Sequence, residues 1–339
     1  MIKFKNILLC IIIFSLFLTL IMFNKTVVEG ALDGMVICAQ RIVPSLFPFT
    51  VVAVFLYNGR YIDSLTPKSE AGQKFIIFII SCLGGFPIGA KIISEAYNGG
   101  RISRTTAENM LCCAINAGPA FCVSVVGAVY YSNQIGIIVF ASSVMSALLI
   151  FLIFNKKSEL PQTTSHSTVG FTENFVYSVS SAAAAMLSVC AYIVIFSSII
   201  NLVDTYFTDN VFKRVLVGTL EVTTAVTNSK NVYLSCFFIG FSGISIIMQV
   251  ISITKCFKPN IFKIILSRIL NGLLLTFNTF LLIKIFKIKV DTISNGYLAK
   301  PLLSQGNVAF SILFLITCAC LIYCLSDKKY SGKLTKDIF

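Results

Sequence analysis

Long apolar runs recur along the whole chain, and the polar connections between them are short. Runs of about 20 apolar residues are those that cross a lipid bilayer as α-helices. The composition agrees, because 56% of the 339 residues are hydrophobic and only 12% are charged, too few to cover the surface of a soluble domain. The sequence therefore predicts an all-α polytopic membrane protein.

Ten apolar segments can be distinguished, and two of them, 75–97 and 211–230, are interrupted or unusually polar. If these two return to the side they entered from, most Lys and Arg residues fall in cytoplasmic connections, as the positive-inside rule requires. Lys213/Arg214 and the lysines of 284–289 fit this arrangement poorly, and 24–34 becomes an external loop. The prediction is about eight transmembrane helices plus two re-entrant hairpins. The eight spans are roughly 7–23, 35–57, 107–131, 135–154, 174–203, 231–254, 263–286 and 308–325.

The order helix, hairpin, helix occurs twice, and the second copy starts from the opposite side of the membrane. Inverted repeats with interrupted segments are typical of secondary transporters, whose substrate site lies where the interruptions meet. The predicted parts are an N-terminal helix, a first repeat with hairpin 75–97, a cytoplasmic linker, a second repeat with hairpin 211–230, and a last helix with a basic tail. Their bounds are 1–30, 31–154, 155–173, 174–287 and 288–339.

The first hairpin contains the stretch GGFPIGAK, residues 84–91, in the middle of an apolar run. Gly84, Gly85 and Pro87 favour a break in the helix. A second helix should begin near Ile88 and direct free N–H groups toward the break, with Gly89 and Lys91 in its first turns. The stretch predicts an anion site. The alternative is an ordinary kinked helix whose lysine reaches the membrane surface.

The second hairpin places Glu221, Thr223 and Thr224 inside an apolar segment. An acid within a membrane segment is a functional candidate by default, because it is costly unless it is paired. Three roles remain open for Glu221: pairing with Lys91, binding of H⁺ or Na⁺, or a hydrogen bond to substrate. The alternative is a structural ion pair that fixes the packing of the hairpin.

The helices that follow the two hairpins add further polar groups. Ser242, Ser245 and Gln249 are spaced to lie on one face of a helix, although serines in membrane helices often serve only close packing. In the first repeat the corresponding helix contains Asn116 in the stretch NAGP, which predicts another break. We expect all these residues to contribute to one substrate-binding site.

Several classes of function are disfavoured by the sequence. The net charge of +13 is distributed over short connections, which argues against a nucleic-acid partner. His166 is the only histidine and the twelve cysteines have no metal-binding spacing, so no metal or cofactor is expected. Phosphate-binding and catalytic motifs are lacking as well, and we expect no enzyme.

Four stretches carry a resemblance to a known family: LFPF at 46–49, GGFPIGAK at 84–91, GGRISRTTAE at 99–108 and LEVTTA at 220–225. They resemble the YlbJ/SpoVV-type sporulation integral membrane proteins, within the nucleoside-recognition or "Gate" domain group related to concentrative nucleoside transporters. The resemblance covers roughly residues 30–255 and does not extend beyond. It implies a protein of the outer forespore membrane of endospore-forming bacteria that moves dipicolinate from the mother cell toward the forespore.

The leading hypothesis is therefore a membrane transporter of a small organic anion such as dipicolinate, with H⁺ or Na⁺ as coupling ions to consider. An ion-coupled nucleoside transporter and a non-transporting scaffold for spore assembly remain alternatives. Besides the solute, the lipid bilayer is the expected partner, and a homo-oligomer is left open.

Overall fold

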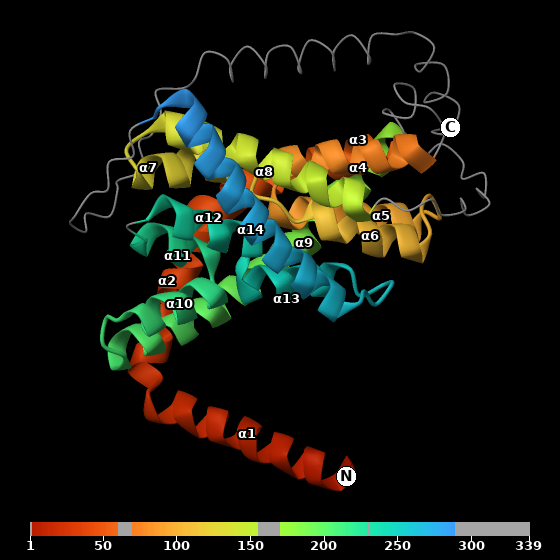
Figure 1. The fold of residues 1–339 in the computed structure, drawn as a ribbon. Coiled ribbons are helices and arrows are strands. Elements are labelled where there is room, and N and C mark those ends of the chain that lie inside the picture. The colour runs from red at the N-terminus through yellow and green to blue at the C-terminus, as the bar shows by residue number, and fades with distance from the viewer. Residues whose placement is uncertain (1, 60–69, 155–169, 230, 289–339) are drawn as a thin grey trace. The chain divides into compact units, whose positions relative to one another are not determined.

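The computed structural model describes residues 2–59, 70–154, 170–229 and 231–288. These belong to one unit, Met1–Gly296. The second unit, Tyr297–Phe339, contains the predicted span 308–325 and lies outside the described residues, as does most of the predicted linker 155–173. Every regular element in the described ranges is helical (Figure 1).

Sixteen helical elements follow one another in the described ranges, two of which, η1 and η3, are π-helical. They are α1 (Ile2–Met22), α2 (Asn24–Ile37), η1 (Cys38–Ile42), α3 (Val43–Asn58), α4 (Glu70–Gly84), α5 (Phe86–Asn98), α6 (Arg104–Ala114), η3 (Phe121–Val126), α7 (Gly127–Val129), α8 (Asn133–Phe154), α9 (Phe171–Tyr206), α10 (Val211–Leu220), α11 (Val222–Asn228), α12 (Val232–Phe241), α13 (Gly243–Ile253) and α14 (Ile261–Phe286).

Four helical stretches are long and apolar enough to cross a membrane: α8, α9, the pair α12–α13 and α14. Large apolar side chains remain exposed along them, as expected where lipid replaces water, with Leu152, Leu187 and Phe277 as examples. The prediction of a helical membrane protein is thus confirmed. The finer count of eight spans and two hairpins stays a prediction.

The predicted external loop 24–34 is wrong, because helical structure runs from Asn24 to Asn58 through α2, η1 and α3. The physical reason lies in Gly30 and Gly34, which form one small-residue face. A Cβ added at Gly30 would lie 2.7 Å from the Cβ of Asn201, so α2 packs directly against the backbone of α9. Close packing of this kind stabilises a helix whose sequence is only weakly apolar.

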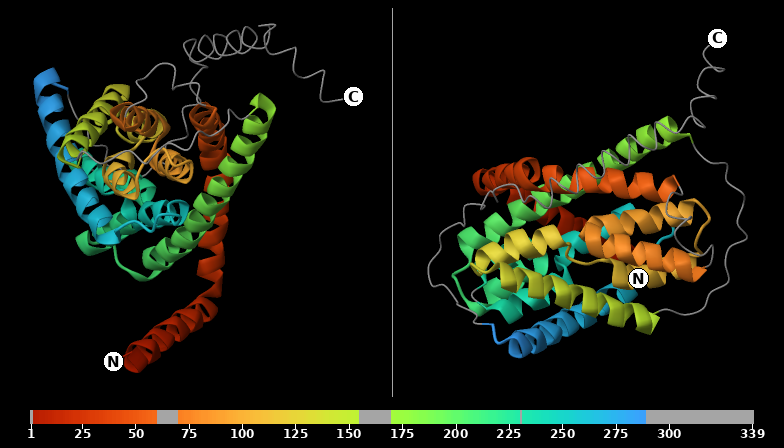
Figure 2. Two further views of the ribbon diagram at one scale, coloured as in Figure 1. Left: turned by 90° about the vertical axis from the view of Figure 1, so that its right-hand side faces the viewer. Right: turned by 90° about the horizontal axis from the view of Figure 1, so that it is seen from above.

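Helices α5 and α6 each contact several other helices. They pack against each other, and α5 also contacts α3, α4, α9 and α13, while α6 also contacts α4, α8 and α14 (Figures 1 and 2). Most of their residues are buried. The predicted candidate residues 85–90 and Asn116 are therefore buried, whereas Gly84 and Lys91 are partly exposed.

Candidate functional site

The chain interrupts its helix at Gly85, between α4 and α5. Gly85 has φ +87° and ψ −174°, a conformation that is essentially restricted to glycine. Pro87 stands in the first turn of α5, where its missing N–H costs nothing. Helix α5 begins at Phe86, two residues earlier than expected, and packs against α4.

A second interruption faces the first one. Helix α6 ends at Ala114, residues 115–118 are not helical, and helical structure resumes at Pro119. A Cβ added at Gly85 would lie 3.1 Å from the backbone nitrogen of Gly118, so the two interruptions touch main chain to main chain. Gly89 also lies against this segment, because a Cβ added to it would meet the carbonyl oxygen of Ala114. The structure thus brings Gly85, Gly89 and the Asn116 segment together.

The second half of the unit repeats this arrangement with other residues. Helices α10 and α11 are separated by Glu221, whose backbone is extended, and α12 and α13 by Ser242, with φ +74°. A Cβ added at Gly243 would lie 3.2 Å from the carbonyl oxygen of Leu220 and 3.3 Å from Cα of Glu221. As in the first half, the interruption between one pair of helices, α10 and α11, contacts the interruption between the next pair, α12 and α13.

The carboxylate of Glu221 caps the N-terminus of α11. It accepts hydrogen bonds from the backbone N–H groups of Thr223, at 2.9 Å, and Thr224, at 2.7 Å. Those donors have no partner within the helix, and a carboxylate is well suited to satisfy them. The pairing of Glu221 with Lys91 that the sequence left open is therefore not formed, since Lys91 has another partner.

The predicted polar face of α13 is formed in part. Ser245 and Gln249 are buried and bonded to each other, with Nε2 of Gln249 donating to Oγ of Ser245 at 3.3 Å. Ser242 does not belong to the helical face, because it forms the break itself. Its hydroxyl donates to the carbonyl oxygens of Ile239 and Gly240, each at 3.4 Å. These bonds satisfy carbonyls at the end of α12.

Lys91 forms an ion pair with Glu95, one turn further along α5, at 2.9 Å between Nζ and Oε1. Glu95 is buried and accepts three more hydrogen bonds, from Asn58 of α3 at 3.1 Å and from Tyr177 and Ser181 of α9 at 2.9 Å each. Both of its oxygens are used. The ion pair thus directs the ammonium of Lys91 toward the C-terminal end of α5, away from the break at Gly85.

The surroundings of Glu95 stabilise its ionised form. Burial raises the pKa of a carboxyl group, but the nearby Lys91 ammonium and the hydrogen bonds from Asn58 and Ser181 outweigh it and hold the pKa of Glu95 below its usual value. Helix α5, with 13 residues, is not one of the helices long enough to span the membrane. The cluster joins α5 to two neighbouring helices by a charged contact.

Sequence reasoning missed Glu95, although its position four residues after Lys91 is the spacing at which charges on a helix pair. It also missed Arg268, which is fully buried in α14. The guanidinium of Arg268 donates to the carbonyl oxygens of Cys112 and Ile115, at the end of α6. A cation is favourable at the C-terminal end of a helix, and here the end results from the break before Asn116.

No carboxylate of the described residues pairs with Arg268, and its Nε has no hydrogen-bond partner among them. Two neighbouring amides are also incompletely bonded. Asn116 donates to the carbonyl oxygen of Cys113 and Asn271 to that of Gly240, but the Oδ1 atom of each has no partner in the described part of the chain. A basic residue in the middle of an apolar helix is the signal by which the sequence could have revealed Arg268. Buried polar atoms without partners are rare, and this makes the region a candidate for binding polar ligands or water.

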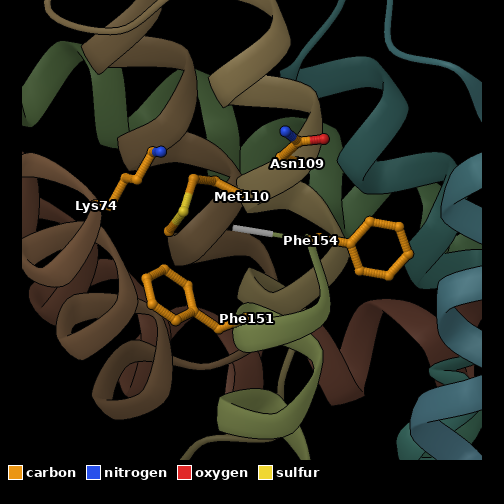
Figure 3. Close-up of a pocket in the computed structure, with 5 residues that line it drawn as sticks. All are labelled: Lys74, Asn109, Met110, Phe151 and Phe154. Atoms are coloured by element: carbon orange, nitrogen blue, oxygen red, sulfur yellow. The ribbon is translucent and has the colours of Figure 1, made fainter. Parts of the chain in front are cut away.

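A small cavity lies elsewhere, between Lys74, Asn109, Met110, Phe151 and Phe154 (Figure 3). Its volume is about 10 Å³, which is enough for one water molecule at most. Lys263 donates to Oδ1 of Asn109 and lies 5.4 Å from the centre of the Phe154 ring. The cavity is too small for an organic solute and is not the candidate site.

Within the ranges that the structure describes, no three His, Cys, Asp or Glu residues come together as a metal site. The nine cysteines in these ranges are all free. No protein-family model, curated protein or solved structure matches the chain significantly.

Proposed function

We propose that the chain is a membrane transporter of a small organic anion. The observation that carries the proposal is the pair of contacts between helix breaks, Gly85 with Gly118 and Glu221 with Gly243. Non-helical backbone within membrane segments is tolerated only where protein buries it or where it lines a polar cavity. Secondary transporters place their substrate sites at such breaks.

The two sets of elements are proposed to be inverted repeats. The series α4, Gly85, α5, α6, break and η3 matches the series α10, Glu221, α11, α12, break and α13 in order and in kind. In this proposal α4–α5 and α10–α11 are the re-entrant hairpins. Lys213 and Arg214, which fitted the charge rule poorly, pair with Asp204 at 3.0 Å and Asp209 at 2.8 Å, so their charge is compensated locally.

Two cations, Arg268 of α14 and Lys91 of α5, support an anionic solute. Arg268 is a buried cation that no carboxylate of the described residues pairs with, and burial of such an ion costs on the order of several kcal/mol unless another charge offsets it. Lys91 supplies a second cation, which an incoming carboxylate can share with Glu95. Dipicolinate, a planar dianion, is the candidate that the sequence resemblance suggests, and the outer forespore membrane is the proposed location.

Uptake by proteoliposomes containing the purified chain tests the proposal. We expect uptake of dipicolinate, and a reduction of about tenfold or more in Lys91→Gln, because a charge-assisted hydrogen bond to the carboxylate is lost. Arg104→Gln, which changes an exposed cation of α6, is the matched control and should transport normally. A failure to transport dipicolinate or any other carboxylate would overturn the proposal and favour the scaffold.

A nucleoside is the second candidate, and one observation favours it. The Oδ1 atoms of Asn116 and Asn271 have no partner among the described residues, and as hydrogen-bond acceptors they suit the N–H and O–H groups of a nucleoside better than a carboxylate. Competition of uridine and adenosine against labelled dipicolinate in the same vesicles separates the two candidates. Uptake of nucleosides without uptake of dipicolinate would replace the first proposal by the second.

A further inference from the structure

Two ion pairs of the same spacing lie on neighbouring helices and differ in burial. Lys91 and Glu95 on α5 have side chains that are 16% and 5% exposed, whereas Arg104 and Glu108 on α6 are 61% and 21% exposed. Water can screen and replace the partners of the second pair. Glu95 depends on protein groups for the compensation of its charge.

The groups that face Glu95 are few and fully defined. Lys91 of α5 is the only cation bonded to it in the described ranges, and the other donors are Asn58 of α3 and Tyr177 and Ser181 of α9. The remaining helices against α5, namely α4, α6 and α13, contribute no hydrogen bond or ion pair to Glu95 in this part of the chain. The guanidinium of Arg101 lies beyond Asn58, bonded to the backbone oxygens of Tyr57, at 2.6 Å, and Asn58, at 3.4 Å.

A carboxylate that arrives from outside reaches Lys91 before it reaches Glu95, because Lys91 is the more exposed of the two. One ammonium cannot neutralise two carboxylates. Like charges close together disfavour the ionised form, and burial disfavours it further. Glu95 would then be the buried carboxylate that lacks sufficient compensation.

The neighbours of Glu95 are able to accept a hydrogen bond from its protonated form. The hydroxyl groups of Ser181 and Tyr177 donate to Glu95 in the structure, but a hydroxyl also accepts hydrogen bonds. After a small rotation, either oxygen can receive a bond from the protonated carboxyl. The neutral acid therefore keeps a hydrogen-bond partner within the same cluster.

We propose that binding of a carboxylate at Lys91 is coupled to protonation of Glu95, so that the organic anion is carried together with one proton. The proton comes from bulk water, and the carboxylate of the solute replaces Glu95 as the main partner of the ammonium. This inference rests on the proposed function, and it assigns coupling to Glu95 and not to Glu221, whose carboxylate serves as a helix cap.

The sign of the pH dependence follows from this exchange. Glu95 has a lowered pKa while it is paired with Lys91, and the pKa rises when the solute binds. Between the two values each binding event takes up one proton, so the affinity increases as the pH falls, by up to about tenfold per pH unit. Outside this interval the affinity should not depend on Glu95.

Titration calorimetry on the full chain in lipid nanodiscs tests the coupling. Dipicolinate is titrated in buffers of different ionisation enthalpy, which yields the number of protons taken up per bound molecule. We expect the natural chain to take up close to one proton per bound dipicolinate and Glu95→Gln to take up none. Glu108→Gln, the equivalent change in the exposed pair, is the matched control and should retain the uptake.

A second measurement uses the natural chain alone, so its outcome does not depend on whether a variant folds. Infrared difference spectra of the natural chain with ¹³C-labelled dipicolinate should show a new C=O band from a protonated protein carboxyl group. Binding without proton uptake and without this band would overturn the coupling but leave the transporter proposal intact. Failure of dipicolinate and of other dicarboxylates to bind would overturn both.

Discussion

The break at Gly85, between α4 and α5, and the break at Glu221, between α10 and α11, are built from different parts. The first uses glycine, and its acid, Glu95, lies almost three turns away in an ion pair with Lys91. The second uses an acid at the break itself, and Glu221 is compensated by the N–H groups of α11. Two carboxylates that look alike in the sequence are therefore held by a charge in one case and by helix donors in the other. Only the first can lose its compensation when an anion competes for its partner.

The largest effect is expected for Glu95→Leu. The substitution leaves the Lys91 ammonium without a counter-ion and deprives Asn58, Tyr177 and Ser181 of their acceptor. Loss of one partner of a mostly buried pair should lower the free energy of unfolding by about 3 kcal/mol. The chain has no tryptophan, so unfolding is best followed with a thiol-reactive dye that reports the exposure of buried cysteines such as Cys113 and Cys236. An unchanged midpoint would mean that the ion pair contributes nothing.

Gly85→Ala should have the next largest effect. The backbone conformation of Gly85 is unfavourable for any residue with a Cβ, and the added atom would meet the backbone of Gly118. We expect a loss of about 2 kcal/mol in the same unfolding assay. Gly170→Ala is the matched control, since no atom lies within 4 Å of its added Cβ and its φ is negative. Equal shifts in both variants would contradict a special role of the first break.

A smaller effect is expected for Glu221→Ala, which removes the cap of α11. Loss of an N-cap acceptor costs about 1 kcal/mol. Glu221→Asn keeps an acceptor at the same position and should recover most of the stability. If Glu221→Ala destabilises the chain as strongly as Glu95→Leu, Glu221 has a partner beyond its helix and the contrast between the two acids fails.

The smallest effect is expected for Glu108→Gln, which breaks the exposed pair with Arg104. Exposed pairs of this spacing contribute about 0.3 kcal/mol, and salt screens them further. A comparison of unfolding midpoints at low and high salt should show a salt dependence that Glu108→Gln removes. A large destabilisation would mean that burial does not distinguish the two pairs.

The apolar runs and the Gly and Pro residues in them were sufficient to predict the helical membrane class and the breaks near residues 84–87 and 116–119. These features depend on local chemistry, which a single sequence displays. The partners of Lys91 and the role of Glu221 were not predictable in the same way, because the choice between a nearby acid and a distant one depends on which helices touch. Arg268 was missed for a related reason: its acceptors are carbonyls that become available only where α6 ends.

The predicted external loop 24–34 is the connection between two predicted spans, but it is helical in the structure because its small residues permit close packing. Gly30 and Gly34 lie one turn apart and create a smooth helix surface against α9. Helix packing of this kind leaves little trace in hydropathy.

The contact of Gly85 with Gly118 joins two segments through main-chain atoms alone. A side chain added at either glycine would push the two backbones apart, and no substitution of a neighbouring side chain could make up for that. A saturation library of the chain should therefore show two isolated positions of near-complete intolerance, far apart in sequence, within surroundings where many apolar residues can be exchanged.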